Sequence, residues 1–211
     1  MSEKALVIEA LVSDLQGAHT AKRNGAHRLE LCASVDLGGT SPTIATVESV
    51  VRGSSLPAMC MVRPRGGNFV YSEAELDEML STITAYKAEG AHGVVFGALN
   101  PDSTWNTDQM TRLVAASRPM AVTAHRAFDE TPDAGAALEQ LIDLGIERVL
   151  TSGQAATAPT GAELLSRLVA LADDRIVILA GAGLTGHNYQ ALATQTGIRE
   201  VHGSWWGRPM A

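Results

Sequence analysis

Short apolar segments alternate with segments of helical periodicity along the whole chain, and this alternation constrains the fold more than any other feature. The apolar segments, rich in Val, Ile, Leu and Met, occupy residues 5–9, 27–32, 58–63, 92–97, 119–125, 146–152, 175–181 and 199–203. Each has the length and composition of a buried strand. Between them, segments such as residues 72–89 and 132–144 repeat apolar residues at the spacing of one helix face, which predicts helices.

A glycine recurs where every second predicted helix passes into a strand, at Gly25, Gly90, Gly145 and Gly197. Glycine there allows the left-handed conformation that ends a helix. Recurrence at every second strand indicates four βαβα quarters, and eight such strands can close into a barrel. We predict one α/β domain over residues 1–211, a (β/α)8 TIM barrel, with an open doubly wound sheet as the alternative.

The predicted barrel lacks a full-length final helix, because only residues 204–211 follow the last predicted strand. The wall of the barrel should therefore be bare at this strand. Trp205 and Trp206 stand beside it and can each bury a large apolar surface. We therefore expect a homodimer or a larger homo-oligomer.

Charge and composition argue against two classes of partner. The formal net charge is -7, and no run of basic residues interleaved with aromatic ones occurs, so nucleic acid is not an expected partner. No apolar stretch approaches the roughly 18 residues that cross a bilayer, so no membrane partner is expected. Two cysteines in a domain of this size do not form a disulfide framework, which favours the cytoplasm.

Polar side chains occur at positions that parity assigns to the barrel interior, because successive strand residues point to opposite faces. Glu9, Glu30, Arg63 and His125 point inward by this rule and are our candidate catalytic residues. They lie late in their strands, where barrel enzymes place their active sites. Neighbouring carboxylates should raise the pKa of His125. The alternative is a salt-bridge network that only fills the barrel, since buried charge is costly unless paired.

Two loops add candidate ligand-binding residues. Arg65 follows the third predicted strand, and Arg126 and Asp129 follow the fifth. Arginine forks suit carboxylates and phosphates, so these loops predict a small anionic ligand. Any single arginine could instead tie its loop to a nearby acid.

The ends of the last three predicted strands supply small and hydroxyl residues: Ser152, Gly181, Gly183, His202 and Ser204. Barrels often hold a phosphate on backbone N–H groups in this region, so we expect these residues to bind the ligand. Short glycine turns are equally an ordinary way to leave a strand.

Metal ligands with the usual zinc spacing are absent from the sequence. Cys60 cannot join Met59 and Met61 around one Cu(I) ion, because neighbouring strand residues face opposite ways. Cys32 points inward and is the candidate metal ligand. A lone inward cysteine also fits an inert core position.

Several longer motifs carry a resemblance to a known family: residues 28–32 (RLELC), 63–67 (RPRGG), 93–99 (GVVFGAL), 125–129 (HRAFD) and 148–153 (RVLTSG). With them the chain resembles the copper homeostasis protein family CutC over nearly its full length. The resemblance implies a TIM barrel, a cytoplasmic location and copper homeostasis, with copper(I) as the expected cofactor or ligand. The alternative function is a barrel enzyme of the lyase or isomerase type, acting on a small anionic or phosphorylated metabolite.

Overall fold

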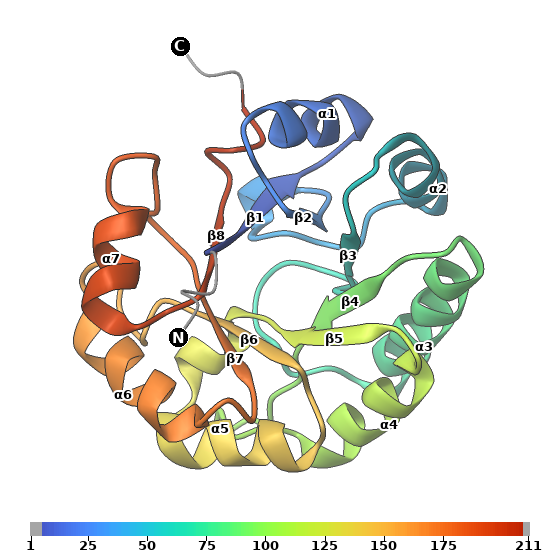
Figure 1. The fold of residues 1–211 in the computed structure, drawn as a ribbon. Helices are drawn as coiled ribbons and strands as arrows, with labels where there is room; N and C mark the ends of the chain where they lie inside the picture. The colour runs from blue at the N-terminus through green and yellow to red at the C-terminus, as the bar shows by residue number, and fades with distance from the viewer. Residues whose placement is uncertain (1–5, 209–211) are drawn as a thin grey trace.

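The computed structural model describes residues 6–208, in which eight parallel strands close into a barrel in sequence order. The strands are β1 (Val7–Val12), β2 (Arg28–Leu31), β3 (Ala58–Met61), β4 (Gly93–Phe96), β5 (Ala121–Ala124), β6 (Arg148–Thr151), β7 (Val177–Ala180) and β8 (Glu200–Gly203). The α-helices are α1 (Leu15–Arg23), α2 (Ile44–Gly53), α3 (Glu73–Ala88), α4 (Thr107–Ser117), α5 (Ala134–Asp143), α6 (Ala162–Ala172) and α7 (Tyr189–Thr196), and the 3-10 helices are η1 (Val35–Leu37) and η2 (Arg126–Glu130). Figure 1 shows the helices arranged around the strands. The predicted TIM barrel is confirmed.

The glycine repeat has the conformation that the sequence predicts. Gly25, Gly90, Gly145 and Gly197 all have a positive φ, between 70° and 85°. His27 lies two residues after Gly25, and His92 lies two residues after Gly90; each histidine joins two neighbouring strands. His27 Nδ1 accepts a hydrogen bond from the backbone N–H of Ile8, and His92 Nδ1 accepts one from that of Ala58. The glycine repeat therefore closes each helix, and in the first two quarters the histidine after the glycine also joins the two strands.

Two separate apolar clusters confirm the predicted strand parity. Cys60 and Val62 belong to the large cluster between strands and helices, whereas Cys32, Met59 and Met61 form a small cluster inside the barrel with Val95 and other residues. The alternation along β3 thus places one sulfur side chain outside and two inside.

The first strand differs from its predicted bounds, and the difference moves Glu9. We expected residues 5–9, but β1 runs over Val7–Val12 because the apolar run continues through Ala10, Leu11 and Val12. Glu9 is therefore in the middle of the strand, opposite Arg28 and His202, and not at its C-terminal end. It lies one layer below the mouth of the barrel.

Residues 204–208 cover part of the wall that we expected to be bare, so that expectation is wrong. No α-helix follows β8 within residues 6–208, and Figure 1 shows the C-terminal segment passing between α7 and α1. Trp206 is only 2% exposed and packs edge-on against Trp205 and Tyr189, with ring centroids 5.6 and 5.3 Å apart. The Asn24 side chain donates to the carbonyl of Trp206 at 2.9 Å. The homo-oligomer stays a prediction, without the bare wall as its reason.

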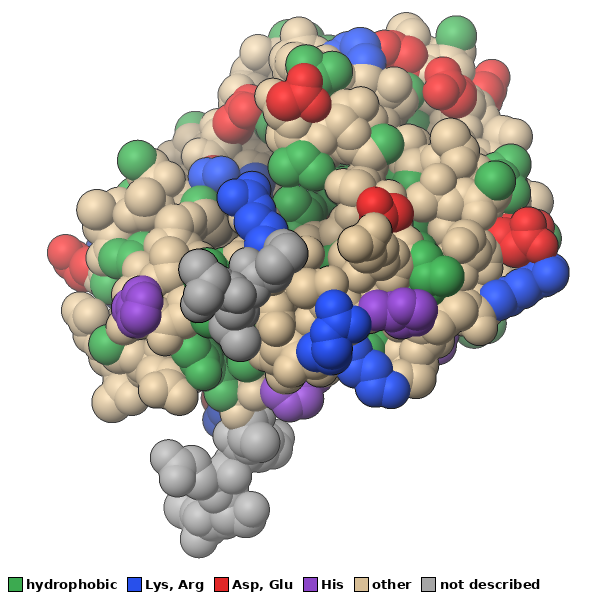
Figure 2. Space-filling view, turned by 90° about the horizontal axis from the view of Figure 1, so that it is seen from above, with side chains coloured by type: hydrophobic (Ala, Val, Ile, Leu, Met, Phe, Trp, Pro, Cys, Tyr) green, Lys and Arg blue, Asp and Glu red, His purple; other side chains and the backbone are tan. Residues whose placement is uncertain are grey.

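The surface carries both signs of charge. On the face in Figure 2, Lys and Arg side chains lie scattered among polar and acidic ones, and they do not form a continuous basic patch. In the part of the chain that the structure describes, no helix is long and apolar enough to cross a membrane.

Candidate active site at the barrel mouth

A network of ion pairs fills the lower interior of the barrel. Arg28 Nε lies 2.5 Å from Glu9 Oε2, and Arg28 Nη2 lies 2.5 Å from Glu200 Oε2. Arg148 Nε lies 2.8 Å from the same Glu200 oxygen. Arg28, Arg148 and Glu200 were not among the predicted site residues, although strand parity already places Arg28 on the same face as Glu30. The geometry of Glu9 therefore fits the alternative that we stated from the sequence, a salt-bridge network that fills the barrel.

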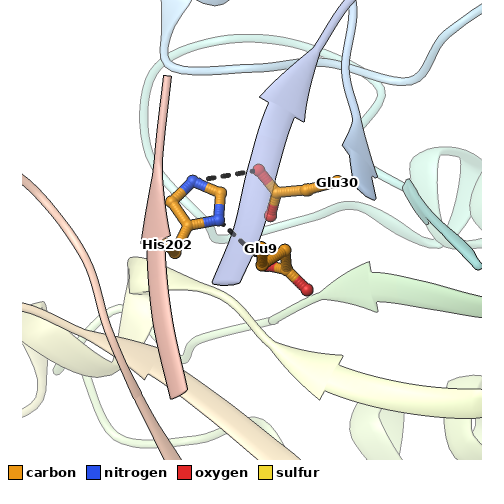
Figure 3. A group of neighbouring side chains, drawn as sticks. All are labelled: Glu9, Glu30 and His202. Carbon is orange, nitrogen blue, oxygen red and sulfur yellow. Dashed lines mark hydrogen bonds and ion pairs between the residues drawn. The ribbon is translucent and has the colours of Figure 1, made fainter. Parts of the chain in front are cut away.

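His202 lies between Glu9 of this network and Glu30, as Figure 3 shows. Its Nδ1 lies 2.9 Å from Glu9 Oε1, and its Nε2 lies 3.6 Å from Glu30 Oε2. The three residues come from β8, β1 and β2, and ligand atoms of all three lie within 4.8 Å of one another. All three side chains are buried.

Burial and mutual charge set the protonation of this trio. Burial opposes ionisation of Glu9, but Arg28 and then His202 outweigh it and lower the pKa of Glu9 to about 2. Burial raises the pKa of Glu30, and the opposing effect of His202 does not cancel this. Burial alone would lower the pKa of His202, yet Glu30 and Glu9 raise it. Glu9 is therefore a fixed anion, whereas Glu30 and His202 together hold a proton more firmly than either would alone.

A cavity of about 180 Å³ opens above this trio at the C-terminal ends of the strands. Five of the predicted site residues line it: Glu30, Arg63, His125, Arg126 and His202. The other lining residues are Leu11, Val35, Gly38, Gly39, Met61, Phe69 and Leu150. The prediction that inward polar residues gather at the mouth thus holds for Glu30, Arg63 and His125, while Glu9 lies beneath them.

Arg63 joins two loops over the mouth. Its Nη1 donates to the carbonyls of Leu37, Gly38 and Gly39 at 3.1–3.3 Å, and its Nη2 donates to the carbonyl of Gly67 at 2.6 Å. Arg63 is only 5% exposed, its Nε is buried without a hydrogen-bond partner, and no carboxylate of the described residues lies within 4.0 Å of it. It is a buried cation whose charge no side chain neutralises.

The pKa of His125 is shifted in the direction opposite to our expectation. We expected carboxylates to raise its pKa, but burial and the nearby charge of Arg63 lower it to about 3. The charged neighbour is a guanidinium and not a carboxylate, so that expectation is wrong. The Nδ1 of His125 accepts the backbone N–H of Ala127 at 3.2 Å, and its Nε2 is buried without a partner.

The remaining loop arginines are paired with acids. Arg65 Nε lies 2.5 Å from Glu75, and its other nitrogens donate to loop carbonyls, away from the cavity. Arg126 Nε lies 2.8 Å from Asp129, and Arg126 Nη2 donates to Ser152 Oγ at 3.0 Å. Both arginines thus hold their loops to a nearby acid, which was the alternative to ligand binding. Arg126 also lines the cavity.

Asp129 and Ser152 form a closed local network. Asp129 accepts hydrogen bonds from the hydroxyls of Thr151 and Ser152 and from the backbone N–H groups of Ser152 and Gln154. Ser152 Oγ also lies 2.6 Å from the Ala155 carbonyl oxygen, so its single proton is donated either to this carbonyl or to Asp129. These hydrogen bonds join the loop after β5 to the loop after β6.

Gly181, Gly183 and Ser204 lie beyond the residues that line the cavity. A Cβ on Gly181 would lie 2.6 Å from Leu150, so glycine here lets the barrel interior pack closely. Gly183 has a φ of 71° and packs against Thr157. Their predicted contact with a phosphate stays a prediction.

Cys32 lies just below the cavity and is fully buried. Its thiol donates to Glu30 Oε2 at 3.4 Å, and burial together with Glu30 raises its pKa well above the ordinary value. Met59 and Met61 belong to the same interior cluster. The Cys32 thiol is therefore protonated, and it lies in one cluster with the thioethers of Met59 and Met61.

A larger hollow of about 480 Å³ lies at the opposite end of the barrel, around the starts of β7 and β8. Three of its four charged residues are already paired: Arg199 with Asp174 at 2.8 Å, and Glu200 with the two interior arginines. Three residues that line the smaller cavity, Glu30, Arg63 and His125, each have a buried polar atom without a partner, so the mouth is the candidate site.

Comparison with known proteins confirms the resemblance seen in the sequence. The CutC family model matches residues 6–207. The chain is 42% identical to the human copper homeostasis protein cutC homolog, covering 93% of this chain and 72% of that protein. It is 45% identical to a family protein CutC of Mesorhizobium japonicum, covering 93% and 76%.

Solved structures agree with these relatives. A crystal structure of CutC from Streptococcus agalactiae is 29% identical, covers 94% of this chain and 98% of that chain, and has a TM-score of 0.90. A 2,3-dimethylmalate lyase has a TM-score of 0.70 over 96% of this chain and 77% of its own, but at 18% identity it shares the fold alone.

Proposed function

The chain belongs to the CutC family, a family of copper homeostasis by the name of its human member, and we propose that this protein is an enzyme that moves a proton on a small anionic metabolite. One observation carries the proposal. The buried Glu30–His202 pair, which holds a proton, shares one cavity with Arg63, a buried cation that no carboxylate neutralises.

The proton-transfer group is Glu30. Its Oε1 is buried without a hydrogen-bond partner, while its Oε2 faces His202 and Cys32. A buried carboxyl with a raised pKa is suited to general acid–base catalysis near neutral pH. Glu9 acts through His202: it orients the imidazole and stabilises its charged form, as a carboxylate behind a histidine does in many active sites.

The anionic substrate is recognised by Arg63. A buried charge without a counterion is costly, and four backbone carbonyls offset only part of that cost. A carboxylate or phosphate of the substrate would complete the pairing. The cavity of about 180 Å³ has room for on the order of six water molecules, which suits a small acid better than a nucleotide.

A thermal-shift screen tests the proposal. Phosphate, small carboxylates and sugar phosphates are added to the wild type, and at least one should raise its melting temperature, because a ligand that binds only the native state stabilises it. Arg63→Met should lose this shift and Arg63→Lys should keep part of it. Arg65→Met, in the same loop but away from the cavity, should respond as the wild type does. If no anion stabilises the wild type, or if Arg63→Met responds fully, the proposal fails.

A second candidate function is copper(I) binding, and the interior sulfur cluster favours it. Cys32, Met59 and Met61 lie in one buried cluster, and thiolate and thioether donors are those that Cu(I) prefers. The donor set fits Cu(I) in kind, and the ion would replace the thiol proton. The Glu9, Glu30 and His202 trio contains no sulfur and suits harder ions.

A competition titration against a Cu(I) chelator tests this candidate. Cys32→Ser should lower Cu(I) affinity, whereas Cys60→Ser, which changes the thiol on the outer face of β3, should not. Equal affinity in both variants and the wild type would exclude a thiol-based site. We also propose that the protein works in the cytoplasm, because both cysteines are free thiols.

A further inference from the structure

We infer that His125 donates a hydrogen bond from its Nε2–H to a carbonyl oxygen of the substrate, and that the substrate therefore carries a carbonyl beside the carbon that Glu30 deprotonates. This inference rests on the proposed function and names its substrate class. It keeps His125 as a candidate catalytic residue, in the role of a hydrogen-bond donor.

The hydrogen-bond pattern of the ring fixes its tautomer. His125 Nδ1 accepts the backbone N–H of Ala127 at 3.2 Å, so Nδ1 presents its lone pair. A neutral imidazole carries one N–H, which must then be on Nε2. An imidazolium would direct a second N–H against that of Ala127. The geometry therefore makes Nε2 a donor and excludes it as a base.

Packing holds the ring in this orientation. Phe69 lies against it with ring centroids 4.7 Å apart, and the backbone of Gly97 lies behind it. A Cβ at Gly97 would lie 2.8 Å from His125 Nδ1, so only glycine leaves room for the ring here. His125 lines the cavity, and Nε2 is its one ring nitrogen that is buried without a hydrogen-bond partner.

Electrostatics keep the ring neutral. Burial and the charge of Arg63 lower its pKa to about 3, so at neutral pH it neither gains nor gives up a proton. A neutral imidazole that faces developing negative charge acts as a preorganised hydrogen-bond donor. Such a donor is most useful where a carbonyl oxygen becomes an enolate oxygen.

The proposed step balances without a further reactant. Glu30, as the carboxylate, removes a proton from the carbon beside the carbonyl. The C–H electron pair forms a C=C bond, and the carbonyl π pair moves to oxygen, where the His125 N–H and the Arg63 charge stabilise it. The proton stays on the Glu30–His202 pair and returns to the substrate at the same or another atom.

Oxalate, a planar mimic of the enolate of a small keto acid, is the probe for the test. Calorimetric titration should show binding to the wild type and a loss of about tenfold or more in affinity for His125→Phe, as expected for one hydrogen bond to a charged acceptor. His125→Gln, whose side-chain amide can replace the N–H, should bind within a few-fold of the wild type. Glycolate lacks the second carboxylate of oxalate. The His125→Phe change should therefore lower the affinity for glycolate less than the affinity for oxalate.

Nitrogen-15 spectra of the wild type add a test that needs no variant. His125 should be a neutral Nε2–H tautomer down to about pH 5. An imidazolium at that pH, no oxalate binding to the wild type, or unchanged oxalate affinity in His125→Phe would each overturn the inference. If anions stabilise the wild type through Arg63 while His125→Phe has no effect, only this inference fails; if no anion binds at all, the proposed function fails as well.

Discussion

Glu9 carries a stabilising charge in the barrel interior, so we expect Glu9→Gln to lower stability by an amount that depends on pH. Burial opposes the charged form, but Arg28 and His202 lower the pKa of Glu9 from 4.5 to about 2. A tenfold change in proton affinity is worth about 1.4 kcal/mol, so the ionised carboxylate contributes about 3 kcal/mol to the free energy of unfolding at neutral pH. Glutamine keeps the shape but resembles the neutral acid, and it loses this contribution.

The sign of the pH dependence follows from the lowered pKa. The contribution is present above about pH 4.5 and is lost as pH falls through the folded-state pKa, so the difference between wild type and variant should shrink to about 1.4 kcal/mol near pH 3. Urea unfolding followed by circular dichroism at several pH values measures it. Glu139→Gln, which removes an exposed pair with Arg175, is the control and should change little. A difference that does not vary with pH, or that stays below about 1 kcal/mol at neutral pH, would refute the reasoning.

Three further changes test other parts of the structure. Gly97→Ala should push the His125 ring out of place and weaken oxalate binding by calorimetry, with an overpacking cost of about 1–3 kcal/mol; unchanged binding would show that the ring position does not matter. Trp206→Ala should lower the free energy of unfolding by about 3–5 kcal/mol in urea, because the ring is only 2% exposed and packs against Trp205 and Tyr189; a change under about 1 kcal/mol would mean that the wall does not depend on it. Light scattering at micromolar concentration tests the homo-oligomer, and a monomer would exclude it.

The sequence predicted the barrel because two independent patterns agreed. The apolar segments set the number of strands, and the glycine repeat set their grouping into quarters. Strand parity then placed Glu30, Cys32, Met59 and Met61 correctly, since alternation is a local property of an extended chain.

The sequence could not predict features that depend on distant neighbours. Glu9 lies deeper than expected because its strand continues past the acidic residue. The pKa of His125 falls because the ring is buried and because its charged neighbour is Arg63, which follows another strand. The ion pairs of Arg28 and Arg148 with Glu200 join strands that the barrel closure alone brings together.

Hydrogen–deuterium exchange tests the central claim, that Glu30 moves a proton on a small anionic metabolite. Each anion that stabilises the wild type in the thermal-shift screen is incubated with the protein in D₂O and followed by proton NMR. We predict that the wild type exchanges a C–H hydrogen of at least one of them, that Glu30→Gln does so at least about a hundredfold more slowly, and that Cys60→Ser matches the wild type. No exchange in any bound anion, or equal rates in Glu30→Gln and the wild type, would contradict the account.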